Sequence, residues 1–153
     1  MIRVQHETFD PAAELARLIE EARDCGAVVS FVGTVRGTSD GDAVNALELQ
    51  HYPGFTEGAI EDIAAAATAR FEVEAIRIVH RHGRLAPGEP IVFVGAAARH
   101  RREAFNAVDY LMDRLKTVAP FWKKESGPAG HRWIEASESD LADRQRWDEN
   151  DRA

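Results

Sequence analysis

One amphipathic segment, residues 100–118, constrains the fold more than any other feature of the sequence. Its apolar residues recur with a period of 3.6, which predicts a long helix that buries one face; they are Ala104, Phe105, Val108, Leu111, Met112 and Leu115. Pro120 cannot continue a helix, so the chain must leave this one just after Lys116 and bend. Positive charge is concentrated near both ends of the predicted helix, at 99–102 and at Lys116, Lys123 and Lys124.

Strand and helix patterns alternate along the rest of the chain. Two more helices are predicted, one that begins at Pro11 after the N-cap Asp10 and ends before Gly26, and one from Thr56 to about Arg70. The apolar, β-branched segment AVVSFVGTV is typical of a strand buried on both faces. Further strands are predicted at 44–52, 73–81, 91–98 and 133–136.

The order of these elements, β-α-β-β-α-β-β-α-β, indicates the fold class. Strands that follow one another directly favour an α+β fold, with a mixed or antiparallel sheet packed with about three helices, over a doubly wound parallel sheet. A length of 153 residues suits a single domain. We expect residues 1–140 to form this domain and residues 141–153 to form an acidic, mobile tail.

Bulk composition excludes several classes of protein. With 44% apolar and 29% charged residues, the chain has the composition of a soluble globular protein. Its net charge of −7 argues against general nucleic-acid binding, and its apolar runs are too short to span a membrane. The N-terminus lacks the apolar core of a secretion signal, and the single cysteine, Cys25, cannot form an internal disulfide. We therefore expect a cytoplasmic protein that binds neither nucleic acid nor membrane.

The basic segment Arg99–Arg102 is the first candidate site. Cationic side chains oppose the dipole at the start of a helix unless an anion joins them. The free N–H groups of that helix end, together with arginine side chains, would form a phosphate or carboxylate site. A solvated basic cap that pairs with surface acids such as Glu103 explains the same residues equally well, so both interpretations stay open.

The lysines of the KTVAPFWKKE segment form the second candidate site. Partial burial of Lys123 beside Phe121 and Trp122 would lower its pKa, and such a lysine can act as an acid–base group or as a nucleophile. The alternative is a structural lysine at a helix C-terminus, favoured by the helix dipole and followed by an aromatic anchor. The residues alone favour this structural interpretation.

Other polar residues give weaker indications. Arg36 ends a predicted strand ahead of a glycine-containing loop, a position that suits both catalytic and ordinary surface arginines. His80 and His82 alternate along one strand, but a third ligand of suitable spacing is missing, so we predict no metal site. Cys25 has no histidine nearby in the sequence, which favours a buried structural cysteine over a nucleophile.

Five segments resemble the large (catalytic) subunits of molybdopterin synthase, the MoaE family. They occur in the family's order, cover about residues 26–140, and read GAVVSFVGTVR, VNALELQHYPG, HRHGRLAPGEPIVFVG, HRREAF and YLMDRLKTVAPFWKKE. The resemblance implies an alpha/beta-hammerhead-like fold and a transferase without a cofactor. Such an enzyme transfers sulfur to cyclic pyranopterin monophosphate and forms the dithiolene of molybdopterin, which later holds molybdenum. The sulfur comes from the C-terminal thiocarboxylate of a small ubiquitin-like partner subunit.

The resemblance also implies roles for residues. Its substrate-binding positions correspond to Thr34, Val35 and Arg36, then His100 and Arg101, then Lys116, and finally Lys123, Lys124 and Glu125. The cyclic phosphate of the substrate suits arginine and histidine side chains, whereas the negatively charged thiocarboxylate suits the two lysines Lys116 and Lys123. These two lysines are the expected catalytic pair.

Helix geometry adds a constraint on this site. His100 and Lys116 lie sixteen residues apart on one predicted helix, which separates them by roughly 24 Å. One small substrate cannot contact both ends of a straight helix. We therefore expect a homodimer, within a heterotetramer that includes the partner subunit, in which His100 and Arg101 of one copy face Lys116 and Lys123 of the other.

Two other functions compete with this interpretation. The chain would be a non-catalytic adaptor if its lysines only gripped the tail of a ubiquitin-like sulfur carrier. A nucleotide-binding or RNA-binding domain that used Arg99–Arg102 is disfavoured by the net charge.

Overall fold

The computed structural model describes residues 1–150, with side chains described as far as Asp148. Its larger sheet has the strand order β1-β6-β8-β2, where β1 is Ile2–Gln5, β2 is Ala27–Thr34, β6 is Val73–Arg81 and β8 is Pro90–Ala98. β1 runs parallel to β6, and the other neighbours are antiparallel. The mixed sheet that the sequence predicts is therefore confirmed.

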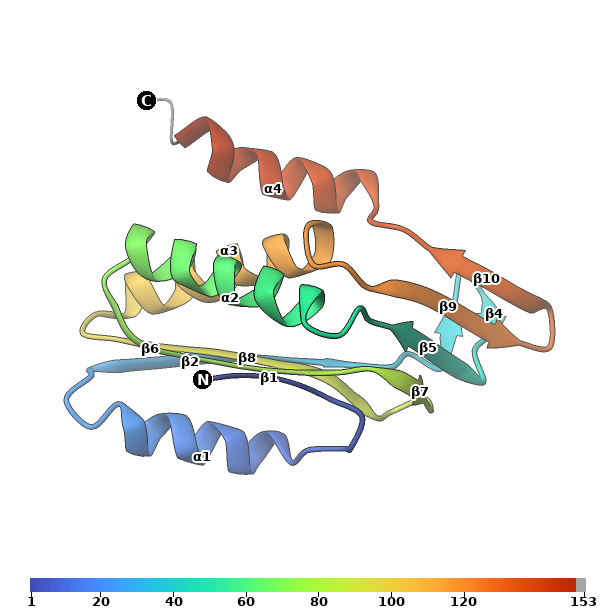
Figure 1. The fold of residues 1–153 in the computed structure, drawn as a ribbon, viewed down its shortest axis with the longest axis horizontal. Coiled ribbons are helices and arrows are strands. Elements are labelled where there is room, and N and C mark those ends of the chain that lie inside the picture. Colours follow the sequence, from blue (N-terminus) through green and yellow to red (C-terminus); the bar gives the residue numbers. More distant parts are fainter. Residues whose placement is uncertain (151–153) are drawn as a thin grey trace.

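Helices cover both faces of the larger sheet (Figure 1). α1 (Pro11–Glu21) lies on one face, and α2 (Phe55–Arg70) and α3 (Arg101–Thr117) lie on the other. α1 begins as predicted, because the Asp10 carboxylate accepts a hydrogen bond from the N–H of Ala12 at 2.9 Å and Pro11 takes the first helical position. α3 ends just before Pro120, which the proline requires.

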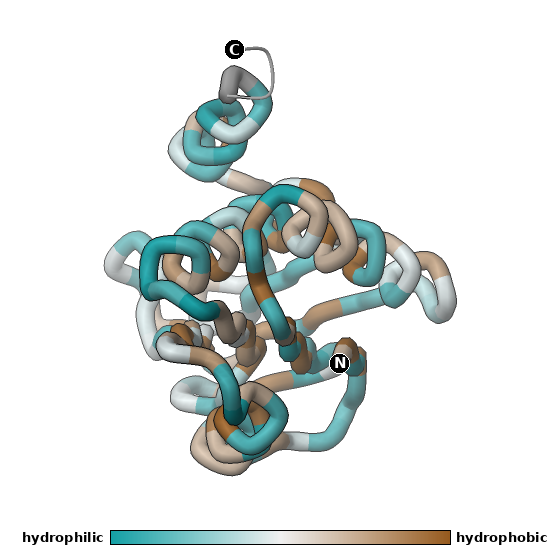
Figure 2. Tube along the Cα trace, turned by 90° about the vertical axis from the view of Figure 1, so that its left-hand side faces the viewer, coloured by the Kyte–Doolittle hydropathy of each residue, from teal (hydrophilic) through white to brown (hydrophobic). Residues whose placement is uncertain are grey.

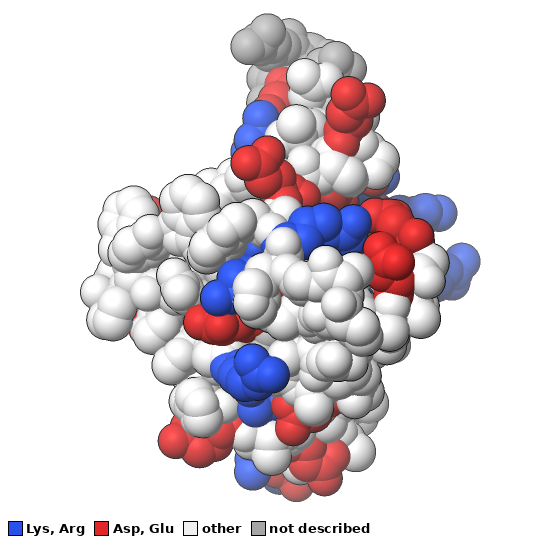
Figure 3. Space-filling view, turned by 90° about the vertical axis from the view of Figure 1, so that its right-hand side faces the viewer, with Lys and Arg blue, Asp and Glu red and all other residues white. Residues whose placement is uncertain are grey.

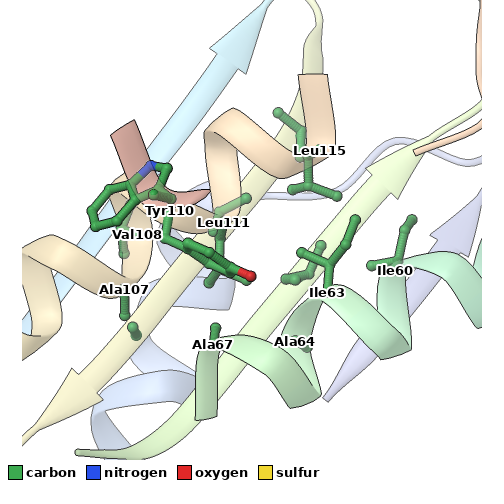
Figure 4. Close-up of a cluster of buried hydrophobic side chains, with 14 residues drawn as sticks. Ile60, Ile63, Ala64, Ala67, Ala107, Val108, Tyr110, Leu111 and Leu115 are labelled. Carbon is green, nitrogen blue, oxygen red and sulfur yellow. The ribbon is translucent and has the colours of Figure 1, made fainter. Parts of the chain in front are cut away.

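The main hydrophobic core lies between α2, α3 and the larger sheet. α2 contributes Ile60, Ile63 and Ala67, and α3 contributes Val108, Leu111 and Leu115 (Figure 4). The three α3 residues belong to the stripe predicted from the 3.6-residue period. Apolar residues gather between the layers of the molecule, as the hydropathy colouring of Figure 2 shows. One member of the predicted stripe, Phe105, lies outside this core with 58% of its surface exposed.

A smaller antiparallel sheet extends from one end of the larger one (Figure 1). Its strand order is β10-β9-β5-β7, formed by β5 (Ala46–Gln50), β7 (Gly83–Leu85), β9 (Trp122–Gly127) and β10 (Gly130–Ile134). A short hairpin consists of β3 (Thr38–Ser39) and β4 (Asp42–Ala43). The sequence indicates β5 and β10 but not β9. The segment KKESG is polar throughout, and it forms a strand because it pairs with β5 and β10 on its two sides.

β2 differs from its prediction. A strand buried on both faces was expected, but β2 lies at the sheet edge and, within the described part of the chain, pairs with β8 alone. The Phe31 side chain is 40% exposed, and its neighbour Val32 is exposed as well. The apolar run therefore does not reflect burial inside this chain. Exposed apolar sheet edges of this kind are common sites of contact with other molecules.

The C-terminal segment also differs from its prediction. Where a mobile tail was expected, the chain forms α4 (Glu138–Asn150), which packs over α3 and is the fourth helix within residues 1–150. Trp147 anchors α4, because it is only 8% exposed, packs edge-on against Tyr110, and donates its indole N–H to the Asp113 carboxylate at 2.7 Å. One buried aromatic residue and several ion pairs with α3 thus hold a mostly polar helix in place. The expected boundary at residue 140 falls inside α4, and the division into domain and tail stays a prediction.

Candidate active site

A pocket of about 770 Å³ lies where the C-terminal end of α3, the smaller sheet and the start of α4 meet. Pro120 turns the chain after α3, so that Lys116 on the helix and Lys123 on β9 both line the pocket. Arg36, which follows β2, lines it from the larger sheet. The rest of the lining includes the apolar side chains of Leu47, Ile91, Phe121 and Ile134 and the polar residues Glu125, Ser137 and Asp140.

Lys116 occupies the last turn of α3. Its side chain is 52% exposed, and its Nζ forms an ion pair with Asp140 Oδ1 at 2.8 Å. A cation is favoured at the C-terminal end of a helix by the helix dipole. Lys116 is therefore a charged group with a defined partner at the wall of the pocket.

Lys123 is more buried and lies on β9. Burial lowers the pKa of this lysine and the positive charge of Lys116 lowers it further, while the negative charge of Asp140 acts in the opposite direction. A lysine whose pKa is lowered exchanges its proton closer to neutral pH. The two lysines therefore differ in character, because Lys116 is exposed and paired with a carboxylate, whereas Lys123 is half-buried near a like charge.

Lys124, the next basic residue on β9, points away from the pocket. Successive side chains of a strand point to opposite faces, so Lys123 and Glu125 line the pocket whereas Lys124 does not. Lys124 instead forms an ion pair with Glu48 at 3.2 Å. Glu125 is itself paired with Arg132 at 3.0 Å. Of the predicted run 123–125, the structure brings Lys123 and Glu125 to the pocket and directs Lys124 away from it.

The predicted segment 34–36 is divided in a similar way. Arg36 is exposed and lines the pocket. Val35 is buried and packs with Leu47 in a small apolar cluster, and its N–H donates to the Glu89 carbonyl at 3.0 Å. Thr34 is exposed at the end of β2 and is not among the lining residues. The arginine is the member of this segment whose side chain reaches the pocket.

His100 and Arg101 lie away from this pocket. α3 is one unbroken helix with His100 as its N-cap, so both residues are at the opposite end from Lys116. A groove of about 620 Å³ between β2 and α3 connects the two ends, with Arg102 near one end and Lys116 and Asp140 at the other. The continuous helix confirms that a small molecule cannot contact both ends within one chain.

Histidine and cysteine side chains do not form a second reactive centre. His80 is buried and stacks on Phe121, with ring centroids 4.0 Å apart, and burial lowers its pKa to about 4, so it is neutral at physiological pH. His82 stacks on His51 with ring centroids 3.9 Å apart. Across residues 1–150, no three His, Cys, Asp or Glu side chains are grouped as metal ligands. Burial raises the pKa of the Cys25 thiol, which opposes formation of a reactive thiolate.

Ser137 and Asp140 line the pocket but are not among the residues that the sequence indicates. The Ser137 hydroxyl and N–H both donate to the Asp140 carboxylate, and the Asp140 N–H donates to the Ser137 hydroxyl at 3.1 Å. This reciprocal arrangement is a capping box, which marks the start of a helix. The Ser-x-x-Asp spacing is visible in the sequence and would have indicated α4.

Charges of both signs lie on the end of the molecule that carries the smaller sheet. Figure 3 shows basic side chains in the middle of this face with acidic side chains around them. A small anionic ligand suits such a surface better than a nucleic-acid backbone, which needs a continuous basic stripe. In the part of the chain that the structure describes, no helix is both long and apolar enough to cross a membrane.

Comparisons with known proteins agree on one family. The family described as MoaE protein matches residues 4–118. The molybdopterin synthase catalytic subunit of Pseudomonas aeruginosa is 53% identical over 148 residues, which are 97% of this chain and 99% of that protein. The molybdopterin biosynthesis MoaE protein of Burkholderia ambifaria superposes with a TM-score of 0.82 and 48% identity, over 96% of this chain and 97% of that one. For the molybdopterin synthase of Staphylococcus aureus the TM-score is 0.77 and the identity 29%, over 86% and 94%.

Proposed function

Since this chain belongs to the MoaE family, we propose that it is the catalytic subunit of a molybdopterin synthase. It transfers sulfur from the C-terminal thiocarboxylate of a small ubiquitin-like partner subunit to cyclic pyranopterin monophosphate, and the product carries a dithiolene. The observation that carries this proposal is the pocket in which Arg36, Lys116 and Lys123 meet. The relatives' name, catalytic subunit, supports an assembly with a second kind of subunit.

Two anionic groups have to enter this pocket, and separate cations are available for them. The guanidinium of Arg36 presents N–H donors in a fork that matches the oxygens of a phosphate. The ammonium of Lys116 has three N–H donors, and its ion pair with Asp140 leaves donors for the partner's thiocarboxylate. The substrate's phosphate and the sulfur-carrying tail are therefore held by different residues.

Lys123 supplies the proton transfer. Addition of sulfur to the pterin side chain and hydrolysis of the acyl group that remains on the partner both require protons to move. A partly buried lysine with a lowered pKa donates and accepts protons closer to neutral pH than an ordinary lysine. Lys116 orients the thiocarboxylate, and Lys123 acts as the acid–base group.

The complete site includes residues of a second copy of the chain. Edge strand β2 exposes Phe31, and α3 exposes Phe105 along the neighbouring groove. Exposed aromatic side chains on a sheet edge and on the adjacent helix form a surface that a second copy would cover. We propose a homodimer, within a heterotetramer that includes the partner subunit, in which His100 and Arg101 of one copy complete the pocket of the other. Their positive charge then adds to that of Arg36 around the substrate.

We also propose that the protein acts in the cytoplasm. Its single cysteine cannot form an internal disulfide, which suits a reducing compartment. Cell fractionation followed by detection of the chain tests this location, and an exported pool would contradict it.

Reconstitution tests the proposed activity. The chain is mixed with the thiocarboxylated partner and cyclic pyranopterin monophosphate, and the dithiolene product is measured by mass spectrometry. We expect product with the wild-type chain and almost none with Lys116→Ala or Lys123→Ala. If the partner's tail binds but intact components yield no product, the chain is an adaptor and the enzymatic proposal is wrong.

A further inference from the structure

Asp140 is held at both of its carboxylate oxygens. Oδ1 lies 2.8 Å from Lys116 Nζ, and Oδ2 accepts hydrogen bonds from the Ser137 N–H at 2.9 Å and from the Ser137 hydroxyl at 2.7 Å. The side chain is 19% exposed and lines the pocket that also contains Lys123. A carboxylate bound on both sides has one preferred orientation, so it also restricts the lysine that it contacts.

Asp140 stays negatively charged across the physiological pH range. Burial acts to raise its pKa, but hydrogen bonds from Lys116 and Ser137 outweigh burial and lower the pKa to about 2. A long, exposed lysine side chain without a partner samples many rotamers. The permanent negative charge beside Lys116 reduces that freedom and keeps the ammonium at the pocket wall.

We propose that Asp140 is a positioning residue for sulfur transfer, which fixes the Lys116 ammonium in the pocket that it shares with Lys123. This role rests on the proposed function of the chain. Asp140 acts through Lys116. Its carboxylate occupies one N–H donor of the lysine, and the remaining donors are available for the partner's thiocarboxylate. Fixed charges aligned before the reaction stabilise a transition state more than mobile ones do.

The same contact makes α4 part of the active site. Asp140 lies in the first turn of α4, and further along the helix Trp147 docks α4 on α3 through Asp113. α4 therefore brings one carboxylate to a lysine of the neighbouring helix. The docking of α4 determines where that carboxylate stands.

A purely structural role for Asp140 is the alternative. An acidic residue in the first turn of a helix completes a capping box, and loss of such a cap lowers the stability of the helix. Capping alone predicts a lower unfolding temperature and an unchanged kcat for the folded enzyme. A positioning role predicts a change in turnover and in the protonation of Lys123.

The test uses Asp140→Asn, with Glu138→Gln as the matched control. Glu138 is exposed in the same turn of α4, so the control removes the same charge outside the pocket. We expect Asp140→Asn to lower kcat roughly ten- to a hundredfold in the reconstituted assay, as misplacement of a reacting group does. Glu138→Gln should leave kcat unchanged. Unfolding temperatures of both variants measure the contribution of the cap.

A second readout needs neither partner nor substrate. Competitive acetylation followed by mass spectrometry measures how the reactivity of Lys123 depends on pH. In Asp140→Asn the midpoint should move to lower pH, because the negative charge that raises the pKa of Lys123 is gone. In Glu138→Gln it should stay at the wild-type value.

Several results would overturn the positioning role. A lower unfolding temperature with unchanged kcat and midpoint makes Asp140 a cap only. Faster turnover of Asp140→Asn shows that the carboxylate competes with the partner's tail for Lys116. If the wild-type chain gives no product, the proposed function is wrong. If the acetylation midpoint of Lys123 in Asp140→Asn also equals the wild-type value, Asp140 has no electrostatic effect on that lysine.

Discussion

Two regions of this protein bury charged groups, and they do so in opposite ways. Beneath α1, the Glu14 side chain is 2% exposed, and its carboxylate accepts hydrogen bonds from Arg3 at 2.7 Å, Arg17 at 2.6 Å and Arg77 at 2.8 Å. In the pocket, by contrast, the half-buried Lys123 lies near another positive charge. The fully paired Glu14 carboxylate holds α1 on the sheet. A lysine that is partly buried beside a like charge costs stability, and its lowered pKa makes it more reactive.

This contrast makes opposite predictions for the two regions. Loss of charge beneath α1 should lower stability without changing catalysis in the folded protein. Loss of the Lys123 charge in the pocket should abolish catalysis without lowering stability. A variant beneath α1 that loses turnover per folded molecule, or a lysine variant in the pocket that loses stability, would contradict this contrast.

Removal of the Lys123 amine has the largest expected effect. Lys123→Ala should lower turnover roughly 10²- to 10⁴-fold in the reconstituted assay, which is the range for loss of an acid–base group. Lys123→Arg keeps the positive charge but cannot release its proton, so it should also lose activity. Near-normal turnover of Lys123→Arg would show that the reaction needs charge alone at this position.

Neutralisation of Glu14 should be the most destabilising change of the set. Glu14→Gln removes the buried ionic partner of Arg77, which keeps only its ion pair with the more exposed Glu21. Loss of a buried ionic partner costs up to about 3–5 kcal/mol of unfolding free energy. Denaturant unfolding measures this, with Glu20→Gln, an exposed acid on the same helix, as the control. Turnover per folded molecule should equal that of wild type. Equal stability of the two variants would contradict a structural role for the buried network.

The stability that Glu14 provides should depend on pH. Burial acts to raise the pKa of Glu14, but hydrogen bonds from Arg3 and Arg77 outweigh burial, and the pKa is lowered from 4.5. A carboxylate with a lowered folded-state pKa stabilises the protein above its unfolded-state pKa, and this contribution is lost as the pH falls through the folded-state pKa. The difference between wild type and Glu14→Gln should therefore shrink below about pH 4.5.

Mixed dimers test whether the pocket is complete within one chain. Lys123→Ala and Arg101→Ala should each be nearly inactive alone. If the site is shared, random exchange of the two variants should restore about one quarter of wild-type activity, because half of the dimers then carry one intact site of two. No recovery after exchange, verified by native mass spectrometry of the mixed dimer, would place both residues in the same copy's site.

The smallest expected effect is a gain in stability in the pocket. Burial lowers the pKa of Lys123, which means that the charged form is disfavoured in the folded state. Lys123→Met should raise the unfolding free energy by about 1 kcal/mol at neutral pH. The gain should fade as the pH rises toward the ordinary lysine value of 10.5, because wild-type Lys123 then also becomes neutral in the folded protein. A lower unfolding free energy of Lys123→Met at neutral pH would contradict a lowered pKa of Lys123 in the folded protein.

The sequence predicts the elements whose periodicity comes from burial within the chain. The stripe of α3, its forced end before Pro120 and the strands β6 and β8 all belong to the main core, where hydrophobic pattern and burial coincide. β2 departs from its prediction because only part of its apolar run is covered. Val28 and Val29 pack against the core, whereas Phe31 and Val32 are exposed, and hydrophobicity alone does not show which apolar residues of a strand the chain buries.

Elements stabilised by long-range contacts were harder to predict. β9 is polar and owes its conformation to two neighbouring strands, and α4 is mostly polar, with Trp147 as its buried aromatic anchor. The residues of the site were indicated by the family resemblance, and their grouping needed the structure. Asp140 contacts Lys116 from 24 positions away, a contact that neither composition nor spacing reveals.

The alternation of β9 makes the site sensitive to the length of the chain. Lys123 and Lys124 have the same chemistry, and only the count of residues from Pro120 decides which of them lines the pocket. Deletion of a single residue in this short connection would exchange the two faces of the strand and present Lys124 in place of Lys123. The site is compatible with substitutions in this connection, but not with a change of its length by one residue.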